Sequence, residues 1–285
     1  MEAAYGRAVE VAPSLRRVLA DNPGPFTYLG TGTYIVGRGE TAVIDPGPDD
    51  PAHLAAILRA VEGERVAAIL VTHTHADHSP LAAALAARTG AVVWGLPNPG
   101  GSTEESGDSR FRPDVQPAEG ARVHGPGWTL EALRTPGHAS NHLAWAWPEA
   151  DALFPGDLVM GWSTSVVSPP DGDMDAYMAS LDKLAARRAS VLYPTHGPPI
   201  TEPAPFLAAL REHRLARERL VLAALEPRPA SATMLTPRVY AGVDARLRPA
   251  AARSLLAHLI RLQRAGRVLA AADPVDVDTL FALAG

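Results

Sequence analysis

Cysteine is absent from the 285-residue chain. Its absence excludes disulfides, thiolate metal sites and thiol nucleophiles, so any catalysis must come from histidine, carboxylate or hydroxyl side chains or from a metal. Long apolar runs are missing too: the N-terminal segment has no apolar core of signal-peptide length, and no later run approaches the roughly 20 apolar residues of a membrane span. We therefore expect a cytoplasmic protein that does not enter a membrane.

Lysine is nearly absent, because Lys183 is the only lysine among 26 basic residues. The charge is distributed unevenly along the chain. Residues 1–204 carry 14 basic and 24 acidic residues, a net charge of −10, whereas residues 205–285 carry 12 and 7, a net charge of +5. Such asymmetry suggests an anionic partner for the C-terminal part. Arginines on solvated helix surfaces are the simpler explanation.

The N-terminal part alternates short β-rich runs with Ala/Leu-rich helical runs. Residues 33–37, 41–47 and 66–71 are typical of strands, and residues 51–61 are typical of a helix with a proline in its first turn. A second helix is expected after the sequence HSP, with Ser79 as N-cap and Gly90 just past its end. Residues 95–120 lack periodicity, which predicts either a lid or a surface insertion.

The pattern changes at about residue 205. Three helical stretches, at 206–226, 233–243 and 249–266, are followed by a short β-like segment that begins RVLAAADP. This order is typical of a winged-helix module. We therefore predict a catalytic domain over residues 1–204 and a winged-helix-like domain over residues 205–285.

Four segments of the first part share one shape, which is an apolar strand, then a few small or turn-forming residues, then a metal-binding type of side chain. They are AILVTHTHADH, ALRTPGH, ALFPGD and VLYPTHG. If these strands belong to one sheet system, their ends converge and form a rigid site. The candidate ligands are His73, His75, Asp77, His78, His138, Asp157 and His196.

Seven ligands exceed the four that a single tetrahedral zinc ion takes, so the set predicts two metal ions. In an extended segment His73 and His75 point to the same side, whereas the adjacent Asp77 and His78 diverge, so one cluster can supply two ions. A purely structural zinc is the alternative. The remaining histidines except His142 are interpreted as ordinary core or surface residues.

These motifs resemble those of a known protein superfamily. THTHADH is similar to the HxHxDH signature of the metallo-β-lactamase superfamily, and His138, Asp157 and His196 follow in the same order as the later metal ligands of that superfamily. More narrowly, NPGPFTYLGTGTYIVG, TPGHASNH, YPTHGP and the C-terminal helices resemble the lactamase-β-like protein 2 group. The resemblance implies an α+β fold, namely a four-layer αββα sandwich followed by a winged-helix-like domain.

The same resemblance implies a ligand assignment. His73, His75 and His138 would hold one metal, Asp77, His78 and His196 the other, and Asp157 would bridge them. Asp45 would orient a ligand ring from behind, although capping of the turn before Pro46 is an equally good interpretation. We expect two divalent ions, zinc first, with manganese or iron as alternatives.

The chemistry expected of such a centre is hydrolysis. A divalent metal can lower the pKa of bound water from 15.7 to about 7, and two ions can hold the resulting hydroxide between them while they polarise the scissile group. The resemblance gives Asp77 the catalytic role of orienting this water and handling its proton. Because metal-binding histidines must be neutral, we expect activity to be lost on acidification.

The substrate stays open between classes. The lactamase-β-like protein 2 resemblance and the basic C-terminal part favour an endoribonuclease that acts on single-stranded RNA. The acidic first part favours a small-molecule thioesterase or lactonase of the glyoxalase II kind, with weak β-lactamase side activity. A winged-helix regulator that binds nucleic acid is the non-enzymatic alternative.

Three further residues are candidate substrate contacts. His142 follows the TPGH motif, and Ser163 and Thr164 lie in the loop after GD. A supporting or surface role is as good an interpretation of His142. The chain departs from the group at Gly32 and Ala76, which leaves the ligands unchanged but alters the wall of the substrate pocket. A homodimer is an open alternative to a monomer.

Overall fold

The computed structural model of the chain describes residues 3–98, 107–226 and 228–285. The chain divides into two compact units. The first contains residues 1–135, 141–164 and 187–203, and the second contains residues 136–140, 165–186 and 204–285. The last change of unit along the chain falls between residues 203 and 204, next to the boundary predicted after residue 204. Residues 136–140 and 165–186 precede that boundary in sequence but pack with the C-terminal helices.

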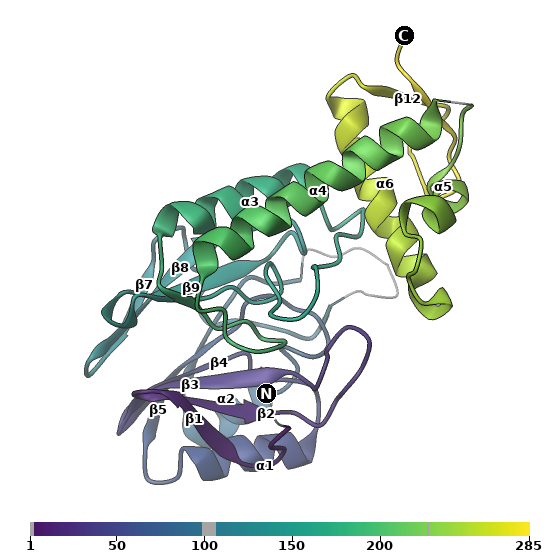
Figure 1. Cartoon of the computed structure of the whole chain (residues 1–285). Coiled ribbons are helices and arrows are strands. Elements are labelled where there is room, and N and C mark those ends of the chain that lie inside the picture. Colours follow the sequence, from purple (N-terminus) through teal and green to yellow (C-terminus); the bar gives the residue numbers. More distant parts are fainter. Residues whose placement is uncertain (1–2, 99–106, 227) are drawn as a thin grey trace. The chain divides into compact units, whose positions relative to one another are not determined.

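The first unit begins with a six-stranded sheet in which each strand lies beside the next along the chain (Figure 1). The strands β4, β5 and β6 run parallel, and the others pair antiparallel. The strands are β1 (Ala8–Ala12), β2 (Leu15–Leu19), β3 (Gly32–Arg38), β4 (Glu40–Ile44), β5 (Arg65–Leu70) and β6 (Val92–Trp94). The strands predicted at residues 33–37, 41–47 and 66–71 are thus confirmed.

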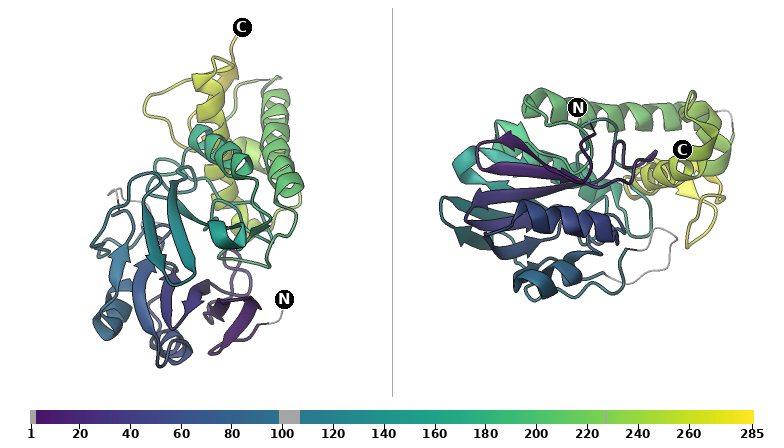
Figure 2. Two further views of the ribbon diagram at one scale, coloured as in Figure 1. Left: turned by 90° about the vertical axis from the view of Figure 1, so that its left-hand side faces the viewer. Right: turned by 90° about the horizontal axis from the view of Figure 1, so that it is seen from below.

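Two helices connect the parallel strands and cover the outer face of this sheet (Figure 2). They are α1 (Pro51–Ala60) and α2 (Ala82–Thr89). Because side chains alternate between the faces of a strand, Ile35, Val43 and Ile69 all face the helices, where they pack with Ile57 and Leu85.

The caps of these helices show where local sequence rules hold. Asp50 caps α1, as its side chain accepts from Ala52 N at 2.8 Å. Gly90 ends α2 with a φ of 73°, as predicted. The prediction of Ser79 as N-cap is wrong: α2 begins at Ala82, Ser79 accepts from Ala82 N through its own carbonyl, and its hydroxyl faces Asp108 at 3.4 Å.

A second sheet of five strands faces the first. Its order is β11-β10-β9-β8-β7. The strands are β7 (Arg122–Gly125), β8 (Trp128–Arg134), β9 (Leu143–Trp147), β10 (Ala152–Phe154) and β11 (Val191–Leu192), with a short 3-10 helix at Pro148–Ala150. Tyr34 and Ile44 of the first sheet share one core with Leu130, Trp145 and Phe154 of the second. The first unit thus contains three layers of the predicted αββα sandwich.

The second unit contains the remaining helices and a hairpin. They are α3 (Met174–Arg187), α4 (Pro203–Leu225), α5 (Ala232–Val239), a 3-10 helix at Ala245–Leu247, α6 (Arg248–Arg264), β12 (Val268–Ala270) and β13 (Phe281–Leu283). Leu225, Leu235, Leu259, Val268 and Phe281 form its core. The predicted order of three helices followed by a β hairpin is confirmed.

The predicted lid and the possibility of a membrane-spanning helix can be compared with the described residues only. Of the predicted lid over residues 95–120, residues 99–106 lie outside the described part of the chain, and the described remainder holds no helix or named strand. Within the described ranges, no helix combines the length and apolar character needed to cross a membrane.

Candidate metal centre

The predicted ligands follow the ends of four strands, β5, β8, β10 and β11, and the structure gathers them into three overlapping groups. Within each group the possible ligand atoms lie within 4.8 Å of one another. The groups are His73, His75 and His138; His73, His78 and Asp157; and Asp77, His78 and His196. All seven predicted residues are included, and His73 and His78 each belong to two groups.

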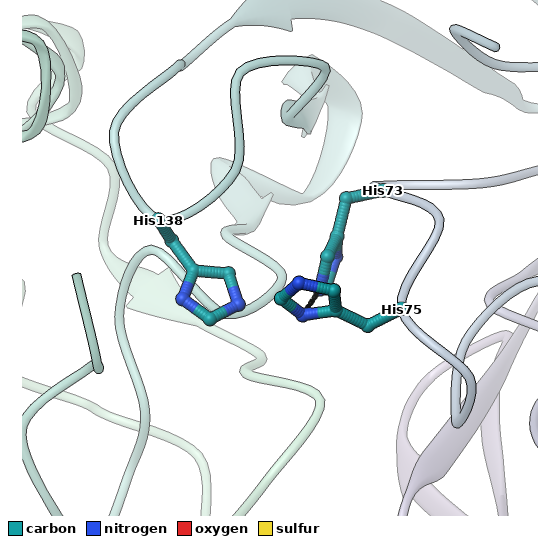
Figure 3. Close-up of side chains that lie close together, drawn as sticks. All are labelled: His73, His75 and His138. Atoms are coloured by element: carbon teal, nitrogen blue, oxygen red, sulfur yellow. Dashed lines mark hydrogen bonds between the residues drawn. The ribbon is translucent and has the colours of Figure 1, made fainter. Parts of the chain in front are cut away.

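The first group is drawn in Figure 3. His73 Nε2 and His75 Nδ1 face each other at 2.9 Å. A cation between two such imidazole nitrogens would accept a lone pair from each of them. A hydrogen bond between them, in contrast, requires one of the two nitrogens to carry a proton.

His78 and His196 each lie between two carboxylates. His78 Nε2 is 3.5 Å from Asp77 Oδ2 and from Asp157 Oδ1, and His196 Nε2 is 3.2 Å and 3.4 Å from the same two oxygens. His78 Nε2 is fully buried, and the two carboxylate oxygens at 3.5 Å lie at the outer limit of hydrogen-bond distance. Since buried polar atoms are normally paired, this nitrogen fits a metal ligand.

The charges of this cluster shift the pKa values of its members. Burial alone would lower the pKa of His196, but the carboxylates of Asp157 and Asp77 outweigh burial and raise it to about 10. Burial would also lower the pKa of His78, but the same two carboxylates and that of Asp45 raise it well above its ordinary value. The two carboxylates therefore create a strong negative potential, which also favours a divalent cation.

Asp45 lies behind the ligands and accepts four hydrogen bonds. Its Oδ1 accepts from Thr72 N at 2.8 Å. Its Oδ2 accepts from Thr72 Oγ1 at 2.8 Å and Thr195 Oγ1 at 3.2 Å, and it faces His78 Nδ1 at 2.9 Å. If His78 Nδ1 carries the proton, its Nε2 presents a lone pair to the centre.

Three more candidate ligand rings have Nδ1 against an oxygen atom of the protein. His73 Nδ1 lies 3.0 Å from Thr72 Oγ1, His196 Nδ1 lies 3.2 Å from the carbonyl of Gly30, and His138 Nδ1 lies 2.6 Å from the carbonyl of Val166. In each ring the other nitrogen, Nε2, is then left with the lone pair that a metal requires.

The segment that contacts His138 is itself held by the C-terminal helices of the second unit. Arg214 of α4, which is 2% exposed, donates from Nη2 to the carbonyl of Ser165, and Ser254 of α6 accepts from Val167 N at 3.4 Å. The guanidinium of Arg214 also lies over the ring of Tyr177, 4.7 Å from its centroid. The Val166 carbonyl is thus flanked on both sides by bonds to helices beyond residue 204.

The three candidate substrate contacts lie in different environments. His142 is fully buried, with Nδ1 2.8 Å from Thr135 Oγ1 and with Nε2 accepting from Asp157 N at 3.2 Å. This position supports the backbone of Asp157. Ser163 is exposed and Thr164 is partly exposed, so both hydroxyls are accessible to a substrate.

Sequence reasoning missed the threonines of the centre. Thr31 donates from Oγ1 to Asp77 Oδ2 at 3.0 Å, while Thr72 and Thr195 donate to Asp45. A signal was present for two of them, because the dipeptide Thr-His follows the end of β5 after one intervening residue and the end of β11 after two. A threonine directly before a candidate ligand histidine, found twice in the chain, could have predicted that both hydroxyls donate to one common acceptor, which is Asp45.

Comparison with protein families gives two matches. Residues 28–196 match the family described as "Metallo-beta-lactamase superfamily". Residues 231–276 match the "Beta-lactamase associated winged helix domain". The first match includes all seven candidate ligands, and the second covers α5, α6 and β12.

Several curated proteins are similar in sequence. The chain is 35% identical over 222 residues to an atrochrysone carboxyl ACP thioesterase of Aspergillus chevalieri, which covers 75% of this chain and 67% of that protein. It is 30% identical over 278 residues to the beta-lactamase-like protein 2 homolog of Caenorhabditis elegans, which covers 91% of this chain and 87% of that protein. The chain therefore spans about two thirds of the fungal protein and most of the nematode one.

Solved structures share the fold. A beta-lactamase domain protein from Burkholderia ambifaria superimposes with a TM-score of 0.82 at 24% identity, over 100% of this chain and 95% of that chain. At this identity the likeness concerns the fold alone.

Proposed function

The chain belongs to the metallo-beta-lactamase superfamily, and from this premise we propose that it hydrolyses a thioester or ester at a centre of two divalent metal ions. Membership makes it a metal-dependent hydrolase. The observation that carries the two-ion proposal is the set of three overlapping ligand groups, in which His73 and His78 each appear twice.

The proposed assignment gives each ion its own residues. His73, His75 and His138 would hold one ion, and Asp77, His78 and His196 the other. Asp157 would lie between them, because its Oδ1 is 3.5 Å from His78 Nε2 and 3.4 Å from His196 Nε2 and it belongs to a group with His73. Nitrogen and carboxylate ligands suit zinc first, with manganese or iron as alternatives.

When bound, the metals would supply hydroxide near neutral pH and polarise the scissile carbonyl. The protein would supply the orientation. Thr31 Oγ1 donates to Asp77 Oδ2 and so restricts rotation of this carboxylate. Although burial opposes it, the charges of His78 and His196 hold the pKa of Asp77 well below its usual range. Asp77 would therefore be ionised at neutral pH and able to accept a hydrogen bond from the attacking water, which would orient that water.

The second proposed role of the protein is to keep the ligand rings still. Asp45 faces His78, and Gly30 and Val166 face His196 and His138 with their carbonyls. His142 would act one step further out, because it accepts from the backbone N–H of Asp157. Direct contact of His142 with substrate stays a prediction, as do contacts of Ser163 and Thr164.

Two observations favour a thioester over RNA. The similarity to a fungal thioesterase extends over three quarters of the chain. In addition, many arginines that make the C-terminal part basic are used within the second unit: Arg211 pairs with Asp182, Arg261 with Glu218 and Arg264 with Asp173. Paired arginines offer less positive potential to a phosphodiester backbone. The single-stranded endoribonuclease prediction is the rival.

One experiment separates the two. Protein loaded with zinc or manganese, and shown to hold two ions per chain, is assayed in parallel on acyl-coenzyme A thioesters by thiol release and on a labelled single-stranded RNA. Asp77→Ala, prepared identically, controls for contaminating enzymes. Thiol release by the wild type alone supports the proposal. RNA cleavage by the wild type without thiol release refutes the thioester proposal and supports the ribonuclease.

A further inference from the structure

Three aromatic side chains are exposed on the first unit. Among the Phe, Tyr and Trp residues that the structure describes, only Phe26, Tyr28 and Trp162 are exposed, at 46%, 37% and 37%, and the others are buried or partly buried. Tyr28 and Trp162 are far apart in sequence, yet their rings stack with centroids 5.1 Å apart and an interplanar angle of 21°. The surface aromatics of the described chain thus gather on two loops, residues 20–31 and 161–164.

Both loops touch the same metal-ligand candidate. The carbonyl of Gly30 faces His196 Nδ1 at 3.2 Å, and Gly161 N donates to the carbonyl of His196 at 2.8 Å. Tyr28 precedes Gly30 by two residues and Trp162 follows Gly161 directly. Since consecutive Cα atoms are about 3.8 Å apart, each aromatic residue begins within about 8 Å along the backbone from an atom that contacts His196.

The loop that carries Phe26 and Tyr28 is ordered by its own bonds. Tyr28 N donates to Gly24 O at 2.9 Å, Gly24 N donates back to Tyr28 O at 3.2 Å, and Gly30 N donates to Thr27 O at 2.9 Å. Tyr28 has a φ of 59°. This left-handed conformation is unfavourable for a residue other than glycine. The loop thus accepts strain while its two aromatic rings remain in contact with solvent, so packing of a core does not explain it.

We propose that Phe26, Tyr28 and Trp162 form the acyl-binding face of the metal centre, and that they take a flat apolar acyl group, aromatic or conjugated, by stacking and apolar contact. The inference rests on the proposed thioester or ester hydrolysis. A ring stack beside the reacting centre suits a planar group because aromatic faces pair in offset stacks. The net charge of −10 over residues 1–204 disfavours a polyanion as the occupant.

The test measures binding and turnover on zinc-loaded full-length protein. The binding probe is 2-naphthoate, followed by isothermal titration calorimetry, and the substrates are 2-naphthoyl- and acetyl-coenzyme A. The variants are Trp162→Ala and Tyr28→Asn, the latter chosen because asparagine tolerates a positive φ. Trp162→Phe keeps a ring, and Val92→Ala removes another exposed apolar side chain of the same unit, 41% exposed.

Base or ring stacking on an aromatic side chain contributes about 1–3 kcal/mol, which corresponds to roughly a five- to 150-fold change. We expect Trp162→Ala and Tyr28→Asn each to weaken naphthoate binding about tenfold. They should lower kcat/KM for the naphthoyl thioester by a similar factor, and lower that for the acetyl thioester by a smaller factor, because a methyl group offers no flat face for stacking. Trp162→Phe should recover most of the binding, and Val92→Ala should match the wild type.

The outcomes separate this inference from the function on which it rests. Ring-dependent naphthoate binding without hydrolysis of either thioester supports the binding face and refutes the thioesterase. Equal binding by wild type and both ring variants, or no binding by the wild type, overturns the binding face. Ring-dependent binding of single-stranded RNA in place of naphthoate overturns it as well and assigns the stack to nucleobases.

Discussion

Replacing Asp45 by asparagine should weaken metal binding while the fold is kept. Asparagine has the same shape and tolerates the φ of 49° found at this position. Either amide orientation, however, places an NH2 group against a fixed N–H donor. In one orientation NH2 replaces Oδ2 and faces His78 Nδ1, and in the other it replaces Oδ1 and faces Thr72 N.

The size of the effect follows from these contacts. In the first orientation His78 is driven to carry its proton on Nε2, which removes the lone pair that would bind the metal. In the second, a buried N–H is left unpaired at a cost of about 1–3 kcal/mol. Substitutions behind a metal ligand typically reduce affinity 10- to 100-fold, and we expect a loss in this range for the ion assigned to Asp77, His78 and His196.

The assay is a competition titration with a chelator of known affinity, together with metal analysis after dialysis. Asp50→Asn is the matched control: Asp50 caps α1 through one hydrogen bond from Ala52 N, and an asparagine oxygen can accept the same bond. Two ions bound with wild-type affinity by Asp45→Asn would refute the reasoning, and loss of both ions together with unfolding would show that Asp45 acts on the fold instead.

Three further predictions concern pH and packing. Because carboxylates raise the pKa of His196 to about 10, protons compete with metal ions for this ring. Metal analysis after dialysis at falling pH should therefore show that the metal ions are released on acidification. Full retention of the metal ions at pH 4 would contradict this. Burial lowers the pKa of His53 to about 4, with Asp50 opposing. Because the unfolded histidine takes up a proton below about pH 6.5 and the folded one does not, metal-stripped protein should lose about 3 kcal/mol of stability between pH 6.5 and 4. Denaturant titrations of His53→Gln should show a smaller loss. Gly156→Ala places a Cβ 2.6 Å from His142 Nε2 at a φ of 52°, whereas the Cβ of the control Gly120→Ala, at a φ of 76°, meets nothing within 4 Å. Thermal unfolding should show Gly156→Ala to be less stable than Gly120→Ala by about 1–3 kcal/mol. Equal melting temperatures of the two variants would exclude the clash.

The sequence predicted the strands and the candidate ligands because both depend on short-range patterns. Where a buried strand is followed by a turn, the next polar residue lies at the edge of the sheet, independently of contacts with distant residues. The sequence contains four such segments, and they carry the seven candidate ligands.

What the sequence did not reveal depends on contacts between distant residues. Ser79 has the right chemistry for a cap, but the turn that carries His78 continues through it and delays α2 to Ala82. Thr31 lies 46 residues from its acceptor Asp77. The ring pair of Tyr28 and Trp162 joins two loops that no local pattern relates.

The division of the chain also changes how its parts can be exchanged during evolution. Residues 136–140, which include His138, and residues 165–186 belong to the same compact unit as the C-terminal helices. Arg214 and Ser254 bond the backbone on both sides of the Val166 carbonyl that faces His138. Exchanging the helices beyond residue 204 for those of a foreign domain would therefore also remove hydrogen bonds that hold the backbone behind His138, a candidate ligand that the exchanged segment does not encode.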